Sequence, residues 1–145
     1  MIGMLLGRGA AGVPPASPVA FDARFALPPS PNTRLLAPPG AALPAHGRIG
    51  PWPVGPDRLW QAVHEVAAAE PRTFPLGSWP ELRQAQWVAR SRLMNYPDIV
   101  VAQIVPEGAA TGLILYSRSL VGWSDLGVNA ARLEAWRAAI EQRLA

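Results

Sequence analysis

The stretch Tyr116-Ser-Arg-Ser-Leu-Val-Gly-Trp-Ser-Asp-Leu-Gly-Val-Asn129 follows an apolar segment and leads into a helical pattern. Gly122 and Gly127 permit positive φ angles, so the polar residues around them can form a tight turn. Asn129 is of a type that favours helix N-termini, and we expect it to be the N-cap. Apolar residues then recur at helical spacing, at Leu133, Trp136, Ile140 and Leu144. The stretch therefore predicts the junction between the last strand and the last helix of a small α+β domain.

Short apolar segments upstream of this junction predict strands. Ile99–Val105 is rich in β-branched residues, and a short turn separates it from Gly112–Tyr116. Two such segments with a short connection predict an antiparallel hairpin. Trp87–Arg90 is a third candidate strand. Thr73–Gly77 is a fourth, and Pro75 restricts it to an edge of the sheet because proline has no N–H to donate.

The first helix is expected to begin at Pro56 and to end before Pro71. Proline suits the first helical turn, and Asp57 suits the positive end of the helix dipole. Apolar residues repeat on one face at Leu59, Val63 and Val66. The order of elements predicts an α+β fold with a small antiparallel sheet of three to four strands. Both helices are expected on one face of that sheet, and a proline-rich extended arm precedes them.

The N-terminal third of the chain differs in composition, because twelve of the 17 prolines lie between Pro14 and Pro56. This segment has no sustained strand or helix periodicity, so we expect an extended arm. We assign residues 1–24 to a flexible or extended N-terminal segment. Residues 25–145 form one α+β domain that includes the arm to about residue 55. The apolar run Met1–Arg8 is too short to cross a bilayer, so no transmembrane helix is predicted.

Composition excludes several kinds of chemistry. All 13 basic residues are arginines, so a P-loop lysine and a Schiff-base lysine are absent. The arginines are scattered among acidic residues, which does not indicate nucleic-acid binding. The chain contains no cysteine, and His46 and His64 lie in different predicted elements. We therefore predict no metal site and no cofactor.

The candidate binding residues surround the quoted stretch. Arg118, with Arg90 or Arg92 from a neighbouring strand, is a candidate pocket for an anion or an acidic partner, because arginine binds carboxylates and phosphates through two donors. Ser119 and Asp125 belong to the same candidate site. The alternative is structural, with Asp125 accepting from loop amides or pairing with Arg118. Ser124 follows Gly122 by two residues, but the next glycine comes one position too late for the G-x-S-x-G spacing of a nucleophile elbow. No catalytic residue is therefore assigned.

Three motifs carry a resemblance to a known family. They are Ser30-Pro-Asn32, Val88-Ala-Arg-Ser-Arg92 leading into Tyr96-Pro97-Asp98, and the quoted stretch. From about Phe25 to the C-terminus the chain resembles the uncharacterised family catalogued as domain of unknown function 1499. The resemblance marks Asn32, Pro97 and Asp98, together with the two glycines and Asn129, as structural residues. It also implies an envelope protein, often with an N-terminal anchor or lipoprotein signal, although the chain carries no lipobox cysteine.

Three functions remain open from the sequence. The favoured one is a non-enzymatic accessory or binding subunit of a membrane-associated or envelope complex, in which the arm lies along a protein partner. A second is a small-molecule or anion-binding protein or enzyme with a pocket near Arg118. The third is a purely structural module. A periplasmic or membrane-associated location is preferred to a cytoplasmic one.

Overall fold

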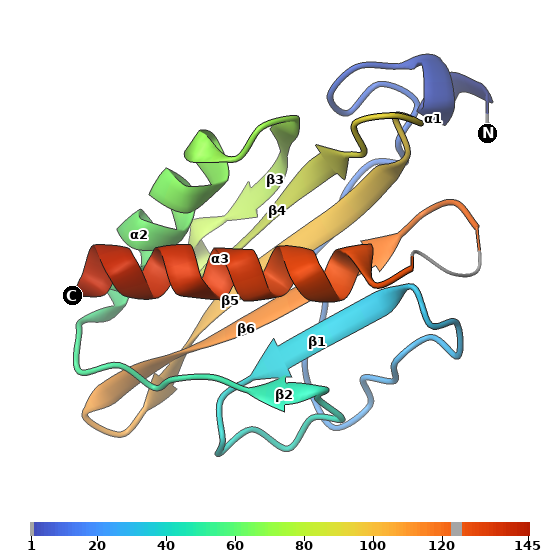
Figure 1. Cartoon of the computed structure of the whole chain (residues 1–145). Coiled ribbons are helices and arrows are strands. Elements are labelled where there is room, and N and C mark those ends of the chain that lie inside the picture. The colour runs from blue at the N-terminus through green and yellow to red at the C-terminus, as the bar shows by residue number, and fades with distance from the viewer. Residues whose placement is uncertain (1, 123–125) are drawn as a thin grey trace.

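The computed structural model describes residues 2–122 and 126–145 of the chain. Within these residues it contains a six-stranded mixed sheet, three α-helices and one 3-10 helix (Figure 1). The elements are α1 (Ile2–Leu6), β1 (Thr33–Ala37), β2 (Gly47–Arg48), α2 (Pro56–Ala69), β3 (Thr73–Trp79), η1 (Pro80–Leu82), β4 (Gln84–Arg90), β5 (Pro97–Glu107), β6 (Ala110–Ser119) and α3 (Val128–Leu144). Among the helices of these residues, none has the length and apolar character needed to cross a bilayer.

The sheet has the strand order β2-β1-β6-β5-β4-β3. β1 and β2 are parallel, whereas the other neighbours are antiparallel. The α+β class is confirmed, but the expected three to four antiparallel strands were too few. The two missing strands come from the proline-rich arm, where β1 pairs with β6 through Leu35 and Tyr116. A five-residue strand between prolines leaves too short a pattern to detect in the sequence.

The predicted central elements are confirmed, with longer strands than the sequence indicated. β5 and β6 form the expected hairpin, and β3 lies at the edge of the sheet. β3 also contains Pro75 and a register shift between Pro75 and Gly77, which agrees with the restriction that proline places on a strand. α2 begins at Pro56, as expected.

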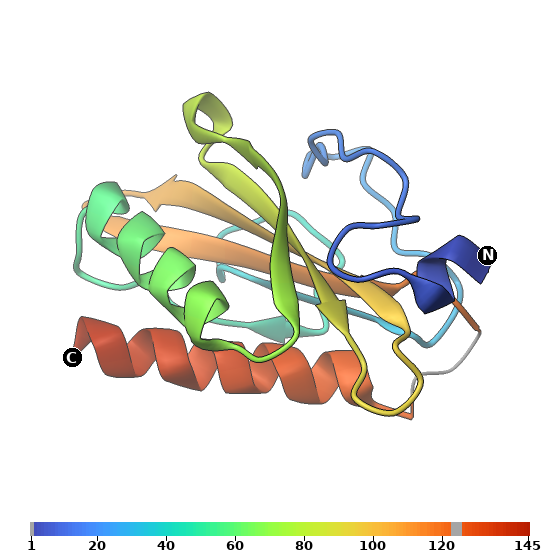
Figure 2. The ribbon, with the colours of Figure 1, turned by 90° about the horizontal axis from the view of Figure 1, so that it is seen from above.

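Both long helices pack on one face of the sheet (Figure 2). Trp136 of α3 and Trp87 of β4 meet edge to face, with ring centroids 5.5 Å apart. Around them the two helices and the sheet bury a continuous apolar cluster that includes Leu59, Val63, Val66, Val100, Leu113, Leu115, Leu133 and Ile140. This cluster is the main core of the domain, since burial of large apolar side chains is the dominant stabilising contribution.

The N-terminal arm covers the opposite face of the sheet (Figure 2). Phe25 lies edge to face against Tyr116 of β6, with ring centroids 5.5 Å apart, and Phe21 contacts both rings. Val13, Val19 and other arm residues pack on a second buried cluster built from Val88, Ile99, Val101 and Ile114. The arm therefore forms a third layer of the domain, and the sheet is covered on both faces.

Polar side chains of β4 hold the main chain of the arm in place. Gln84 accepts from the amide of Val19 at 2.8 Å and donates to the carbonyl of the same residue at 2.8 Å. Gln86 donates to the carbonyl of Ser17 at 2.9 Å. Residues 17–19 belong to no strand, so these glutamines supply hydrogen bonds to a partly buried main chain that has no ladder partner there.

Replacing Gln84 is expected to loosen the arm. In Gln84→Ala both bonds to the partly buried main chain of Val19 are lost, and each lost bond costs roughly 0.5–1.5 kcal/mol. Chemical denaturation should show this loss, and hydrogen exchange should show a faster rate at the Val19 amide. The exposed neighbour Glu81, replaced by alanine, is the control. Unchanged exchange at Val19 in Gln84→Ala would contradict this role.

His46 makes the connection between β1 and β2 sensitive to pH. Its Nδ1 atom accepts from the amide of Leu35 at 2.9 Å, so this nitrogen is unprotonated in the folded state. Burial, and then the charge of Arg34, lower the pKa of His46 below its usual value of 6.5. A histidine with a lowered folded-state pKa contributes stability above the unfolded pKa, and that contribution is lost as pH falls through the folded pKa.

We expect NMR titration to give His46 a pKa below that of an unstructured histidine. The pH dependence of stability below neutral pH should weaken in His46→Gln, which does not become charged in this range. A His46 midpoint at or above the value of an unstructured histidine would show that the bond to Leu35 does not hold in solution.

Candidate functional site

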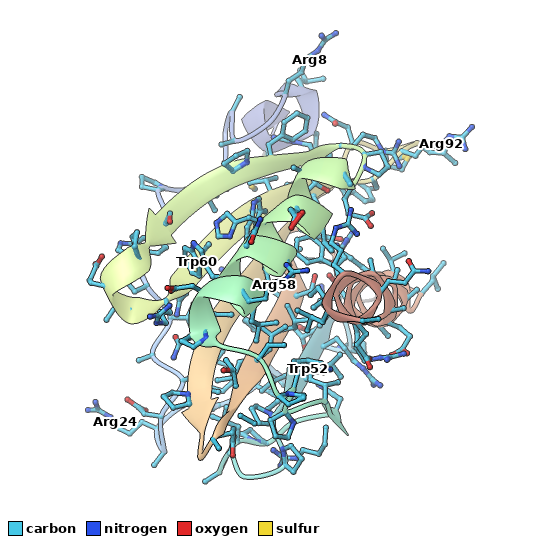
Figure 3. The ribbon with its side chains drawn as sticks, turned by 90° about the vertical axis from the view of Figure 1, so that its left-hand side faces the viewer. Arg8, Arg24, Trp52, Arg58, Trp60 and Arg92 are labelled. Carbon is cyan, nitrogen blue, oxygen red and sulfur yellow. The ribbon has the colours of Figure 1, made fainter. Side chains whose placement is uncertain are left out.

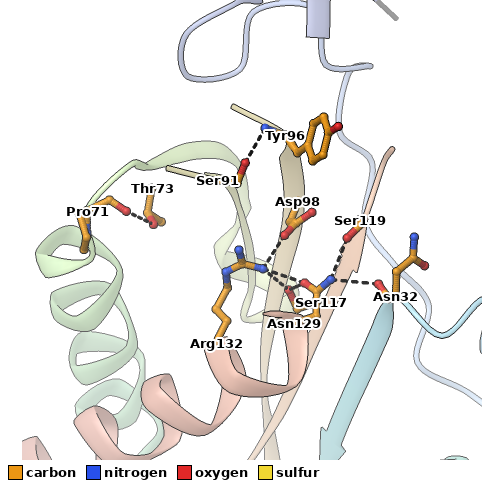
Figure 4. A network of polar contacts seen from close by, with 10 residues as sticks. All are labelled: Asn32, Pro71, Thr73, Ser91, Tyr96, Asp98, Ser117, Ser119, Asn129 and Arg132. Atoms are coloured by element: carbon orange, nitrogen blue, oxygen red, sulfur yellow. Dashed lines mark hydrogen bonds and ion pairs between the residues drawn. The ribbon is translucent and has the colours of Figure 1, made fainter. Parts of the chain in front are cut away.

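A buried polar network joins the first turn of α3 to the ends of β5 and β6 (Figure 4). Arg132 donates to the carboxylate of Asp98 at 2.8 Å and to the side-chain oxygen of Asn129 at 2.7 Å. The Arg132 side chain is 14% exposed and that of Asp98 is 5% exposed. Charges removed from water this far are stable only when they are paired and hydrogen-bonded, so the two residues depend on each other.

Asn129 extends this network to the segment before β1. Its side-chain nitrogen donates to the carbonyl of Asn32 at 3.0 Å and to Ser119 at 2.9 Å, and Ser117 donates to its side-chain oxygen. Asn32 in turn donates to the carbonyl of Gly122 at 2.8 Å. The network therefore links four of the residues marked as structural in the sequence, although they come from three segments of the chain: Asn32, Asp98, Gly122 and Asn129.

Asn129 is not the N-cap that the sequence indicated. The N-cap position is occupied by Gly127, whose φ of 83° lies in the left-handed region that favours glycine. Asn129 lies one residue inside the helix and is 1% exposed. The sequence pattern alone does not distinguish an asparagine at the cap from one that is buried in the first turn.

The network is fully satisfied within the part of the chain that the structure describes. In residues 2–122 and 126–145 no buried side-chain nitrogen or oxygen lacks a hydrogen-bond partner. The hydroxyls of Ser117 and Ser119 contact amide and guanidinium groups, which do not act as a general base. Such an arrangement fixes the geometry of the surrounding loops, but it supplies no activated nucleophile.

The three candidate arginines have different surroundings. Arg90 points under the arm and donates to the carbonyls of Gly9 at 3.0 Å and Ala11 at 2.8 Å, and also to Met4 and Asn95. Arg118 lies on the same face of the sheet and lines a cavity of about 170 Å³ beneath residues 13–19. Arg92 is exposed in the loop between β4 and β5. Arg90 is thus committed to main-chain carbonyls, whereas Arg92 faces solvent.

The remaining candidate residues divide in the same way. Ser119 belongs to the network, whereas Asp125, and with it the predicted pair with Arg118, lies outside the described residues. His46 and His64 contact main-chain groups in separate elements. Across the described ranges no group of three or more histidine, aspartate or glutamate side chains is arranged to hold a metal ion.

A pocket of about 320 Å³ opens beside the network. Asp98 and Ser119 contribute its polar side. Its apolar side is formed by Tyr96, Val121, Leu126 and Val128. These residues come from the loop between β4 and β5 and from both ends of the connection between β6 and α3. The network therefore lies next to the pocket, and it fixes the positions of β5, β6 and α3 around it.

Exposed apolar residues lie at the end of the sheet where this pocket opens, and three of them, Tyr96, Leu126 and Val128, line the pocket itself. Leu93 is 91% exposed, Leu126 is 95% exposed and Leu6 of α1 is 78% exposed. We use the name apolar end for the set Leu6, Leu93, Met94, Tyr96, Leu126 and Val128, which are all exposed. In Figure 2, α1, the loop between β4 and β5 and the start of α3 lie at the same end of the sheet.

The apolar end was not predicted from the sequence. Its one signal is Leu93-Met94, an apolar pair directly before a turn of asparagine, tyrosine, proline and aspartate. A turn is normally a surface feature, so apolar residues next to it are candidates for exposure. Leu6 and Leu126 carry no such signal, because only the folded arrangement brings them to the same end.

A family model described as "Protein of unknown function (DUF1499)" matches residues 15–140. The chain belongs to this family. The match covers most of the arm and every strand of the DUF1499 domain, so the resemblance expected from the sequence motifs is confirmed. No curated protein matches the chain.

The buried pair in this DUF1499 domain is expected to be essential for stability. Arg132→Met removes the cation and leaves the buried carboxylate of Asp98 without it, which costs roughly 3–5 kcal/mol. Urea denaturation measures this cost. Arg137 lies on the same helix but makes partly exposed ion pairs, so Arg137→Met should cost only about 0.2–1 kcal/mol.

A double-mutant cycle separates the pair from its neighbours. Adding Asp98→Asn to Arg132→Met should recover part of the loss, because the buried negative charge is removed together with the cation that faced it. Equal losses in the free energy of unfolding for Arg132→Met and Arg137→Met would show that the buried pair stabilises the fold no more than the partly exposed ion pairs do.

Proposed function

We propose that the protein is a non-enzymatic binding module of a membrane-associated or envelope complex, and that the apolar end is its contact surface. The observation that carries the proposal is the gathering of Leu6, Leu93, Met94 and Leu126 at one end of the sheet. Soluble monomers expose single apolar residues at random, but a cluster of large, highly exposed ones indicates an interaction site.

The arm is less suited to contact a partner than the sequence indicated. Its aromatic residues pack on Tyr116, and its carbonyls are bound by Gln84, Gln86 and Arg90. A partner that bound the arm would first have to break these contacts, which costs free energy. We therefore assign the contact to the apolar end.

Hydrogen bonds behind the apolar end hold its segments in a fixed position. The Asn95 side chain donates to the carbonyls of Leu5 at 2.6 Å and Gly7 at 2.8 Å, so α1 is held against the loop that carries Leu93. On the other side, the Arg132 network fixes the start of α3. Surfaces ordered before binding lose less entropy on association, which favours a binding role.

An anion site at Arg118 has less support than the apolar end. The second arginine expected there, Arg90, directs its donors to main-chain carbonyls of the arm and the neighbouring loop. The cavity beside Arg118 is also bounded by apolar residues such as Ile99 and Val101. A pocket for a carboxylate or phosphate normally brings several donors together.

The proposal is tested with substitutions at the two ends of β4. Leu93→Ser combined with Met94→Ser should abolish co-migration of the tagged protein with a detergent-extracted membrane complex on native gels. Leu82→Ser is the matched control, because Leu82 is 49% exposed and lies in η1, at the opposite end of β4. Both variants should keep wild-type melting behaviour, since exposed substitutions usually change stability by less than about 0.5 kcal/mol.

Two results would count against the proposed function. One is a wild-type protein that migrates only as a free monomer after extraction from native membranes. The other is a double variant that stays in the complex as well as Leu82→Ser does.

A further inference from the structure

We infer that the apolar end docks on an anionic lipid surface, with its leucines in the acyl boundary and neighbouring arginines at the headgroup phosphates. This inference rests on the proposed function, because it takes the same surface as the point of contact and names what it contacts. It differs from the expected N-terminal anchor, since the contact is made by folded loops and a short helix rather than by a membrane-spanning segment.

The shape of the apolar end is suited to insertion into a lipid surface. Leu6, Leu93 and Leu126 belong to three separate segments, and each side chain is more than three quarters exposed. Single side chains that protrude in this way can enter the acyl boundary independently of one another.

The charges next to these leucines are those that a negatively charged membrane surface attracts. Arg92 directly precedes Leu93, and Arg8 follows Leu6 by two residues, so an arginine accompanies two of the apolar side chains. Both arginines are exposed. Figure 3 shows Arg8 and Arg92 projecting outward in the upper part of the view, whereas Arg24 projects from the lower part. Guanidinium groups bind phosphate oxygens through two donors.

Arg72 adds a third cation on the same side. It is exposed, and its carbonyl accepts from the amide of Arg90 at 2.9 Å, at the end of β4 from which the Leu93 loop leaves. Asp98, which lines the pocket, is buried and paired with Arg132, so it contributes little negative charge to the surface. Arg8, Arg72 and Arg92 therefore place three positive charges beside the apolar end, against one negative charge from the partly exposed Glu70 two residues before Arg72, and this excess of positive charge complements anionic headgroups.

The test uses the full chain and sedimentation with lipid vesicles. Vesicles of phosphatidylcholine alone are compared with vesicles that also contain phosphatidylglycerol, each at low and at high salt. We expect partitioning into the anionic vesicles that weakens with salt, and much weaker partitioning into the neutral ones. Leu93→Ser with Met94→Ser should lower the partition coefficient at least about tenfold, since two apolar side chains no longer leave water.

The charge contribution is measured separately. Arg8→Gln with Arg92→Gln should remove most of the preference for anionic vesicles while it leaves the weak neutral binding unchanged. Leu82→Ser and Arg24→Gln are the matched controls, because Arg24 has a 91% exposed side chain and pairs only weakly with Asp22, at 3.6 Å. Both controls should bind like the wild type, and melting curves should show that all variants are folded.

The outcomes separate this inference from the proposed function. If the wild type ignores anionic vesicles while the Leu93 and Met94 variant still leaves the membrane complex, the partner is a protein and the lipid inference is wrong. If neither vesicles nor a complex bind the wild type, both proposals fail. Equal loss of vesicle binding in Leu82→Ser would show nonspecific adsorption, and it would also overturn the inference.

Discussion

The side chain of Asn129 holds together three parts of the chain that are distant in sequence. It joins the first turn of α3 to the end of β6 and to the residue before β1, and Arg132 connects the same group to β5. A hydrophobic core alone allows a helix to slide along a sheet, because apolar contacts have no direction. Hydrogen bonds in a buried site do have direction, so this asparagine sets the position of α3 relative to the strands.

Periodicity and turn chemistry were sufficient to predict the long elements. β5 was found because Ile99, Val100 and Val101 are β-branched, and α2 because its proline and aspartate mark a helix start. β1 was missed, since its partner β6 lies some 80 positions later and only that pairing stabilises it. Strand pairing of this kind is a tertiary effect that local sequence does not encode.

The candidate site was predicted in part. Asn32, Asp98 and Asn129 were recognised in three separate motifs, and the fold links them through direct hydrogen bonds and through Arg132, which the motifs did not predict. The partner of Asp98 was not predicted, because Arg132 looks like any surface arginine in a helix. The exposure of Leu126 could not be predicted either. An apolar residue in a loop is equally compatible with packing against its own domain, and only the fold distinguishes the two cases.

Both edges of the sheet are poorly suited to accept another strand. β2 has only two residues, and β3 carries Pro75 together with a break in register. Short strands, proline and irregular pairing are the features that prevent edge-to-edge association of sheets. With its two faces covered by the helices and by the arm, the sheet presents little main chain for association. Assembly with any larger structure thus depends on side chains, and the specificity of that assembly can change through single substitutions without disturbing the fold.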